Sequence, residues 1–236
     1  MANFPKALAH GSIIPITDGV HCVRGSFNMG PAVTIGRTMT VVDGGDGLVV
    51  FNAVRLSEEG EAELEKLGTV KHLVKLSDSH CVDEPYYADR YQPTVWSMPT
   101  AKMGDLSVGN PIGAEGPIQG AKVIGFGDLK GWAESAYWLP VGGGTLITCD
   151  VVQNCTDQER FSFIGRIMCN MMGFKGGVVT PPMWRKVQKL KGAELGDSLS
   201  TLAELKFENF VSGHGGPVIG GADKIVKGAI ASAVAA

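Results

Sequence analysis

Short apolar runs separated by glycine-rich turns are the feature that most constrains the fold of this chain. Its 236 residues include 33 glycines, many of which stand between runs rich in Val, Ile and Thr. Branched residues favour extended strands, and glycine adopts the positive φ angles of tight turns without strain. We therefore expect strands over residues 13–23, 32–42 and 48–54, with a hairpin turn at residues 43–47. The first third of the chain should form an antiparallel sheet.

Helices and further strands follow in an order typical of α/β domains. Residues 57–68 predict a short surface helix that begins after Ser57 as N-cap and ends at Gly68. The remaining patterns predict strands over residues 70–76, 94–98 and 121–126, a hairpin of residues 135–140 and 145–149, and helices over residues 84–91, 198–206 and 222–234. This order predicts two packed sheets with helices outside, a four-layer αββα sandwich of the α/β class. We expect a single domain over residues 1–236.

Residues 161–174 are apolar and rich in Met, which is typical of a packed helix or a covering loop, and we assign them no chemistry. The five cysteines are odd in number and lack paired spacing, so we expect mostly buried, reduced thiols. Cys81 stays open as a reactive or ligating residue because it lies inside a polar cluster.

Composition excludes several classes of function. Hydrophobic residues make up 44% and charged residues 19%, with a net charge of -3, so the chain is neither disordered nor a basic nucleic-acid binder. No apolar stretch approaches the roughly 20 residues that span a bilayer, and the first residues do not resemble a secretory signal. We expect a cytoplasmic protein whose partner is a small-molecule substrate or ligand, with no nucleic-acid or membrane partner. The oligomeric state stays open.

Three polar clusters stand where expected strands end, and they carry the candidate metal ligands Asp78, His80, Asp83, Asp150 and His214. Imidazole and carboxylate are the usual ligands of divalent transition metals, and separate strand ends can converge on one ion. Three of these residues also have a structural explanation. His80 could be a core or capping histidine, Asp150 a helix cap, and His214 part of a plain glycine-rich turn.

From about residue 13 to the final helix, these landmarks together resemble the metallo-β-lactamase superfamily. The strand at residues 48–52 is similar to the one that ends in the family's Asp-Thr-Gly turn. Residues 78–83, Asp-Ser-His-Cys-Val-Asp, occupy the place of the His-x-His-x-Asp-His motif. The run at residues 142–150 resembles the strand that ends in the bridging aspartate, here Asp150. Residues 212–217 resemble the loop of the last histidine, here His214.

The departures from the family motif bear on the metal site. In the main motif only His80 is unchanged, and Asp78, Val82 and Asp83 replace two histidines and an aspartate. Asn52 replaces the turn aspartate. The family's middle histidine would fall near residues 131–132, where Glu134 is the nearby candidate, and its participation stays open. This resemblance thus implies a first metal position with Asp78, His80 and Asp150, and a second with Asp83, Asp150 and His214.

This donor set contains two histidines and three carboxylates, which is richer in oxygen than a usual zinc hydrolase site and shifts preference toward iron or manganese. We expect one divalent ion, Fe, Mn or Zn. The leading hypothesis is a metal-dependent hydrolase-like enzyme that activates water, with Asp83 or Asp150 as the catalytic base. One alternative is a non-catalytic member whose metal site has decayed and which binds a small ligand or a protein. Another is redox chemistry on iron.

Overall fold

The computed structural model describes residues 4–80, 82–98, 106, 110–112, 116–126 and 129–236. Its larger sheet has the strand order β1-β2-β3-β4-β5-β6-β7, antiparallel from β1 to β4 and parallel from β4 to β7. The strands are β1 (Ile14–Thr17), β2 (Val20–Gly30), β3 (Val33–Asp43), β4 (Leu48–Phe51), β5 (Val70–Lys75), β6 (Thr94–Ser97) and β7 (Asn110–Pro111). The expected antiparallel start is confirmed, including the hairpin turn between β3 and β4.

The second sheet has the order β14-β13-β10-β9-β8, in which β10 and β13 run parallel and the other neighbours antiparallel. Its strands are β8 (Lys122–Gly125), β9 (Ser135–Leu139), β10 (Thr145–Ile147), β13 (Asn209–Val211) and β14 (Val218–Ile219). A separate two-stranded sheet pairs β11 (Gln153–Asn154) with β12 (Val178–Val179). The predicted hairpin of β9 and β10 is confirmed.

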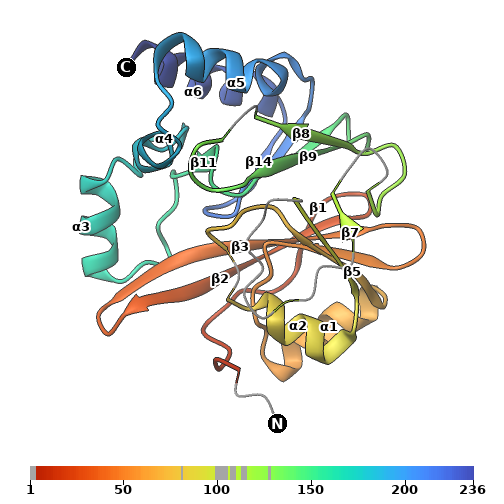
Figure 1. Cartoon of the computed structure of the whole chain (residues 1–236). Helices are drawn as coiled ribbons and strands as arrows, with labels where there is room; N and C mark the ends of the chain where they lie inside the picture. The colour runs from red at the N-terminus through yellow and green to blue at the C-terminus, as the bar shows by residue number, and fades with distance from the viewer. Residues whose placement is uncertain (1–3, 81, 99–105, 107–109, 113–115, 127–128) are drawn as a thin grey trace.

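Helices cover the outer faces of both sheets, as Figure 1 shows. On the larger sheet lie α1 (Glu58–Leu67) and α2 (Glu84–Tyr91), and on the second sheet lie α5 (Gly192–Glu204) and α6 (Ala222–Ala235). Helix α4 (Pro182–Gln188) lies beside the second sheet, while α3 (Phe163–Met171) stands out from the side of the molecule. The four-layer αββα sandwich is thus confirmed. In the described part of the chain no helix combines the length and apolar character needed to cross a bilayer.

Among the residues that the structure describes, three separate apolar clusters fill the spaces between the four layers. One joins the larger sheet to α1 and α2 and includes Leu64 and Tyr87. A second, with Phe51 and Tyr137, lies between the two sheets. The third joins the second sheet to the C-terminal helices. Burial of such apolar side chains is the main favourable contribution to folding, so each helix is held by the sheet beneath it.

Three expectations about individual elements differ from the structure. Residues 13–23 form two strands rather than one, because Gly19 takes a φ of +70° and turns the chain between β1 and β2. Helix α5 begins at Gly192, ahead of the expected residue 198, and its buried Leu195 continues the apolar stripe. Residues 161–174 do contain a helix, but the expectation of packing is wrong for its outer face, where Phe163 is 77% exposed.

Candidate metal centre

Three loops that follow strands bring His80, Asp150 and His214 together. His80 lies in the loop after β5 of the larger sheet, whereas Asp150 and His214 follow the parallel neighbours β10 and β13 of the second sheet. Carboxyl ends of parallel strands meet at one edge of a sheet, which accounts for the approach of Asp150 and His214. His80 reaches them from the other sheet, so the cluster spans both sheets.

The three side chains form a nearly equilateral triangle of ligand atoms. The Nε2 atoms of His80 and His214 are 3.2 Å apart, and Asp150 Oδ1 lies 3.5 Å and 3.4 Å from them, respectively. A tetrahedral ion with bonds of about 2.0–2.1 Å has ligand-to-ligand edges of roughly 3.3–3.4 Å. The triangle therefore fits three ligands of one transition-metal ion. No other such group of His, Cys, Asp or Glu occurs within the residues that the structure describes.

Hydrogen bonds orient His214 for this role. Its Nδ1 lies 2.6 Å from the carbonyl oxygen of Gly36 on β3. Because a carbonyl oxygen only accepts, Nδ1 must carry the proton, which leaves the lone pair of the neutral ring on Nε2. A backbone carbonyl on the outer nitrogen is the usual support of a metal-binding histidine.

His80 is buried, and this burial lowers the pKa of its imidazole although the carboxylate of Asp150 opposes the shift. The neutral ring is the form that binds metals. Its buried Nδ1 has no hydrogen-bond partner among the described residues. A buried polar atom without a partner costs free energy, and the polar contacts given for this ring are those of Nε2 with His214 and Asp150.

The carboxylate of Asp150 is held by two side chains besides the histidines. Ser79 Oγ donates to Oδ2, and Gln153 Nε2 donates to Oδ1 at 2.7 Å. Burial alone would raise the pKa of Asp150, but the neighbouring His80 and His214 hold it well below its ordinary value. The side chain is thus an anion with fixed orientation.

Glu134 supports the backbone at Asp150 and Val151. Its Oε1 accepts the backbone N–H groups of Asp150 and Val151, each at 2.7 Å, and its Oε2 accepts Trp184 Nε1 at 2.8 Å. Burial, together with the charge of Asp150, raises the pKa of Glu134 to about 8. Both of its oxygens are occupied by these donors, and Glu134 is not one of the three clustered groups.

Asp78 and Asp83, the other expected ligands, lie outside this cluster. Asp83 is buried and its Oδ2 accepts from Arg37 Nη1 at 3.2 Å and from the backbone N–H of Arg55 at 3.1 Å. Asp78 accepts the backbone N–H of Ala133 at 3.2 Å, and its Oδ1 lies 3.6 Å from the ammonium of Lys75. Cys81 lies outside the described residues.

A cavity of about 240 Å³ adjoins the cluster, which contributes to its lining. Most of the other lining side chains are apolar and come from the covering segments, among them Trp132, Phe161, Met168, Met172, Phe174 and Met183. Arg37 also lines it, but the ion pair with Asp83 neutralises its charge.

Sequence reasoning missed three residues of this site. Arg37, Ser79 and Gln153 all line the cavity, and two of them hydrogen bond to Asp150. The available signal for Arg37 was a single basic residue within the otherwise uncharged run 32–42. Ser79 and Gln153 gave no signal beyond their proximity in sequence to His80 and Asp150.

By sequence alone, no protein-family model matches the chain and no curated protein matches it. Solved structures do match. The metallo-β-lactamase FIM-1 from Pseudomonas aeruginosa, in a mono-zinc form, has a TM-score of 0.61 at 10% identity and covers 98% of each chain. The metallo-β-lactamase of Erythrobacter litoralis with β-mercaptoethanol in its active site has a TM-score of 0.61 at 11% identity, over 93% of this chain and 96% of that one. That of Hirschia baltica has a TM-score of 0.57 at 10% identity, over 96% and 97%.

These similarities extend over nearly the whole length of both proteins, and at 10–11% identity what they show is the fold. The chain has the metallo-β-lactamase fold.

Proposed function

We propose that the chain binds one divalent metal ion through His80, Asp150 and His214 and acts as a metal-dependent hydrolase-like enzyme. The observation that carries this proposal is the triangle of ligand atoms, whose sides of 3.2, 3.4 and 3.5 Å fit one coordination sphere. Three protein ligands and an open position are typical of catalytic rather than structural metal sites. The orientation of His214 by Gly36 and of Asp150 by Gln153 supports it.

The donor set of two imidazoles and one carboxylate fits zinc, iron(II) and manganese. A bound ion of this kind supplies a Lewis acid that polarises a carbonyl or phosphoryl oxygen and lowers the pKa of water. A single ion agrees with the positions of Asp78 and Asp83. Their carboxylates face Lys75 and Arg37, which leaves no second group of ligands in the described part of the chain.

The side chains of the protein would divide the remaining work. Asp150 presents Oδ1 to the triangle. Its Oδ2 accepts a hydrogen bond from the hydroxyl of Ser79 and has a further lone pair that can accept a proton. We therefore assign Asp150 as the base. Asp83 does not line the cavity, and we assign it the role of fixing Arg37 in the cavity wall. The apolar lining would exclude bulk water and strengthen these electrostatic interactions.

A non-catalytic ligand-binding protein is the second candidate. The apolar character of the cavity favours it, because pockets that bind small molecules are lined mainly by hydrophobic side chains with few polar groups. Under this alternative the cluster of His80, Asp150 and His214 would be a remnant that needs no metal. The two candidates share a cavity and differ in metal content.

Metal analysis distinguishes these candidates. The protein is purified without chelators or a metal-affinity column, and its metals are measured by mass spectrometry. We expect about one equivalent of Zn or Mn for a hydrolase, and hydrolysis of p-nitrophenyl esters or phosphoesters that a chelator abolishes. One equivalent of iron would favour redox chemistry, and no metal, even after reconstitution, would favour the ligand-binding alternative.

Two variants and a control test the ligands themselves. His80→Ala and His214→Ala should each lose the metal while the fold persists, since the three apolar clusters do not depend on them. The control is His72→Ala, because His72 also pairs with an aspartate, Asp46 at 3.3 Å, but lies outside the site. Retained metal in both site variants would refute the proposed ligand set.

A further inference from the structure

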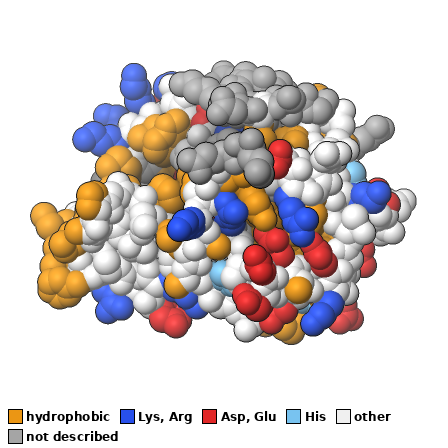
Figure 2. Space-filling model, turned by 90° about the horizontal axis from the view of Figure 1, so that it is seen from below, with side chains coloured by type: hydrophobic (Ala, Val, Ile, Leu, Met, Phe, Trp, Pro, Cys, Tyr) orange, Lys and Arg blue, Asp and Glu red, His pale blue; other side chains and the backbone are white. Residues whose placement is uncertain are grey.

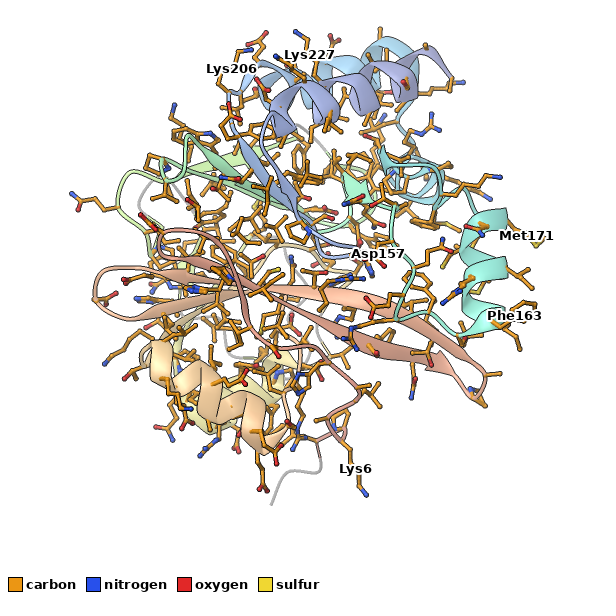
Figure 3. All side chains as sticks on the ribbon, turned by 180° about the vertical axis from the view of Figure 1, so that it is seen from behind. Lys6, Asp157, Phe163, Met171, Lys206 and Lys227 are labelled. Carbon is orange, nitrogen blue, oxygen red and sulfur yellow. The ribbon has the colours of Figure 1, made fainter. Side chains whose placement is uncertain are left out.

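Helix α3 differs from the other helices in that it exposes a row of large apolar side chains. Phe163 is 77% exposed, Ile164 50%, Ile167 46% and Met171 84%. Their spacing places them on one side of the helix. Figure 3 shows Phe163 and Met171 pointing away from the body of the protein, and Figure 2 shows hydrophobic side chains gathered at the corresponding edge. We call these four side chains the outer face of α3.

The outer face is exposed because contacts with β3 fix the orientation of α3. Ser162 caps the helix by accepting Gly165 N–H at 3.1 Å, and its backbone N–H donates to Thr34 of β3 at 3.0 Å. A Cβ on Gly165 would lie 2.4 Å from the Thr34 carbonyl oxygen, so the helix approaches the strand at this glycine. The exposed residues therefore face solvent in a well-anchored helix.

The opposite side of α3 belongs to the cavity of the candidate metal centre. Met168, Cys169 and Met172 line that cavity. One nine-residue helix thus separates an apolar cavity from an apolar surface. Met29 of β2 also lines the cavity and is 52% exposed.

On α3 and in the loop after it the charged side chains are basic, whereas the acidic Asp157 and Glu159 ahead of the helix both pair with Arg24. Residues 160–175 contain Arg160, Arg166 and Lys175 and no acidic residue, and both Arg166 and Lys175 are exposed. Exposed Phe and aliphatic side chains flanked by Lys and Arg are typical of helices that lie in the interface of an anionic lipid layer. A second copy of the chain would bury about 800 Å² per partner in a stable dimer, which four side chains on a short helix do not supply.

We propose that the outer face of α3 rests on an anionic lipid surface, and that the cavity behind it takes the apolar chain of a lipid-class substrate. The assignment of a lipid-class substrate to the cavity rests on the proposed function, whereas the lipid contact of α3 does not. The expectation of no membrane partner came from the lack of a spanning stretch, which does not bear on a helix that lies along a surface. Outside the cluster, the charged side chains that line the cavity are paired, Arg37 with Asp83 and Asp157 with Arg24, which suits an uncharged chain.

Vesicle co-sedimentation tests the lipid contact with the full chain. We expect binding to phosphatidylcholine vesicles that contain phosphatidylglycerol, weaker binding to phosphatidylcholine alone, and weakening by salt. Phe163→Ser combined with Met171→Ser should weaken binding about tenfold or more. Ile219→Ser is the matched control, because Ile219 is 61% exposed on β14. Arg166→Gln with Lys175→Gln should weaken binding to the anionic vesicles only.

Three outcomes would overturn this contact. They are no vesicle binding by the wild type, equal binding by the Phe163/Met171 variant, or a dimer in solution that this variant abolishes, which would assign the face to a second copy. Circular dichroism of the variants verifies that they fold. Protein stripped of metal by a chelator should bind vesicles as well as untreated protein, so a failure of the proposed metal function does not affect this result.

The cavity is tested with the uncharged fluorescent probe N-phenyl-1-naphthylamine. We expect the probe to bind with increased fluorescence, to be displaced by dodecanol, and to bind about tenfold more weakly to Met168→Gln or Met172→Gln than to the Ile219→Ser control. Probe binding that neither variant changes would overturn the assignment of the cavity to an apolar chain. Because binding of the probe involves no chemistry, the result is separate from that of the hydrolysis assays.

Discussion

The Nε2 atoms of His80 and His214 face each other at 3.2 Å, although 134 positions separate the two residues in sequence. His214 cannot turn away, because Gly36 holds its other nitrogen. Two imidazole nitrogens and the Asp150 carboxylate therefore converge on one point. A cation at that point would interact with all three groups at once, and this leads to the first prediction.

Metal binding should stabilise the protein. A metal concentration of about 100 times Kd adds about 2.7 kcal/mol to the free energy of unfolding, and raises the melting temperature by roughly 5–10 °C for a chain of this size. Differential scanning fluorimetry of chelator-treated protein, with and without added Zn²⁺ or Mn²⁺, measures the shift. His72→Ala should keep it and His214→Ala should lose it. An equal shift in both variants would place the bound metal elsewhere.

Glu134 should contribute strongly to stability although it is not a ligand in the triangle. Replacing it with Ala removes the acceptor of three buried N–H groups, those of Asp150, Val151 and Trp184. We expect the free energy of unfolding in urea to fall by about 3 kcal/mol or more. Glu194→Ala, which removes an exposed carboxylate paired with Lys130, should change it by no more than about 0.5 kcal/mol. Similar losses in the two variants would contradict this assignment.

The buried pair of Arg37 and Asp83 predicts a pH-dependent loss of stability. Burial raises the pKa of Asp83, and Arg37 opposes this shift. A raised pKa means that the folded state holds its proton more firmly, so stability from this group is greatest at low pH and falls as pH rises through the folded-state pKa. Without Arg37 the pKa should rise further.

Arg37→Met should therefore cost about 3–5 kcal/mol near pH 7, where the carboxylate is buried without its partner, and clearly less near pH 4, where it is protonated. Urea unfolding at the two pH values measures the difference. In the double variant Arg37→Met/Asp83→Asn, the amide still accepts the N–H of Arg55 and most of the stability at pH 7 should return. A cost of Arg37→Met that does not change with pH would exclude the mechanism.

Gly215, next to His214, should tolerate no side chain. Its φ is +79°, and a Cβ there would lie 1.8 Å from the carbonyl oxygen of Asn154. Gly220 has a similar φ of +83° but open space around it. We expect Gly220→Ala to cost about 1–2 kcal/mol from backbone strain alone, and Gly215→Ala to cost more and to weaken metal binding by displacing His214. Equal costs in urea unfolding would show that the approach of Asn154 does not matter.

Local sequence patterns predicted most of the helices and strands, because caps, turns and apolar runs each depend on a few neighbouring residues. Ser57 does cap α1 by accepting Gly60 N–H, and the run into Asp150 does form β10 of a hairpin. The turn at Gly19 and the early start of α5 were missed because short apolar runs and single glycines do not define element boundaries. These differences leave the order of the layers unchanged.

The site could be predicted only in part, because the partner of a buried side chain depends on strands far away in sequence. The strand-end clusters indicated His80, Asp150 and His214, which the fold brings together. They could not indicate that Asp83, three positions from His80, faces Arg37 of β3 instead. Nor could they indicate the donors from Ser79 and Gln153, since these depend on how the loops pack.

The triangle takes one corner from the larger sheet and two from the second, and this division has a mechanical consequence. An ion held there would cross-link the two sheets, so that one sheet could not slide over the other without breaking a coordinate bond. Occupancy of the site would then slow the opening of the sandwich itself. Amide hydrogens of β5 and β13, one strand from each sheet, should both exchange with solvent more slowly in the metal-loaded protein than in the metal-free protein.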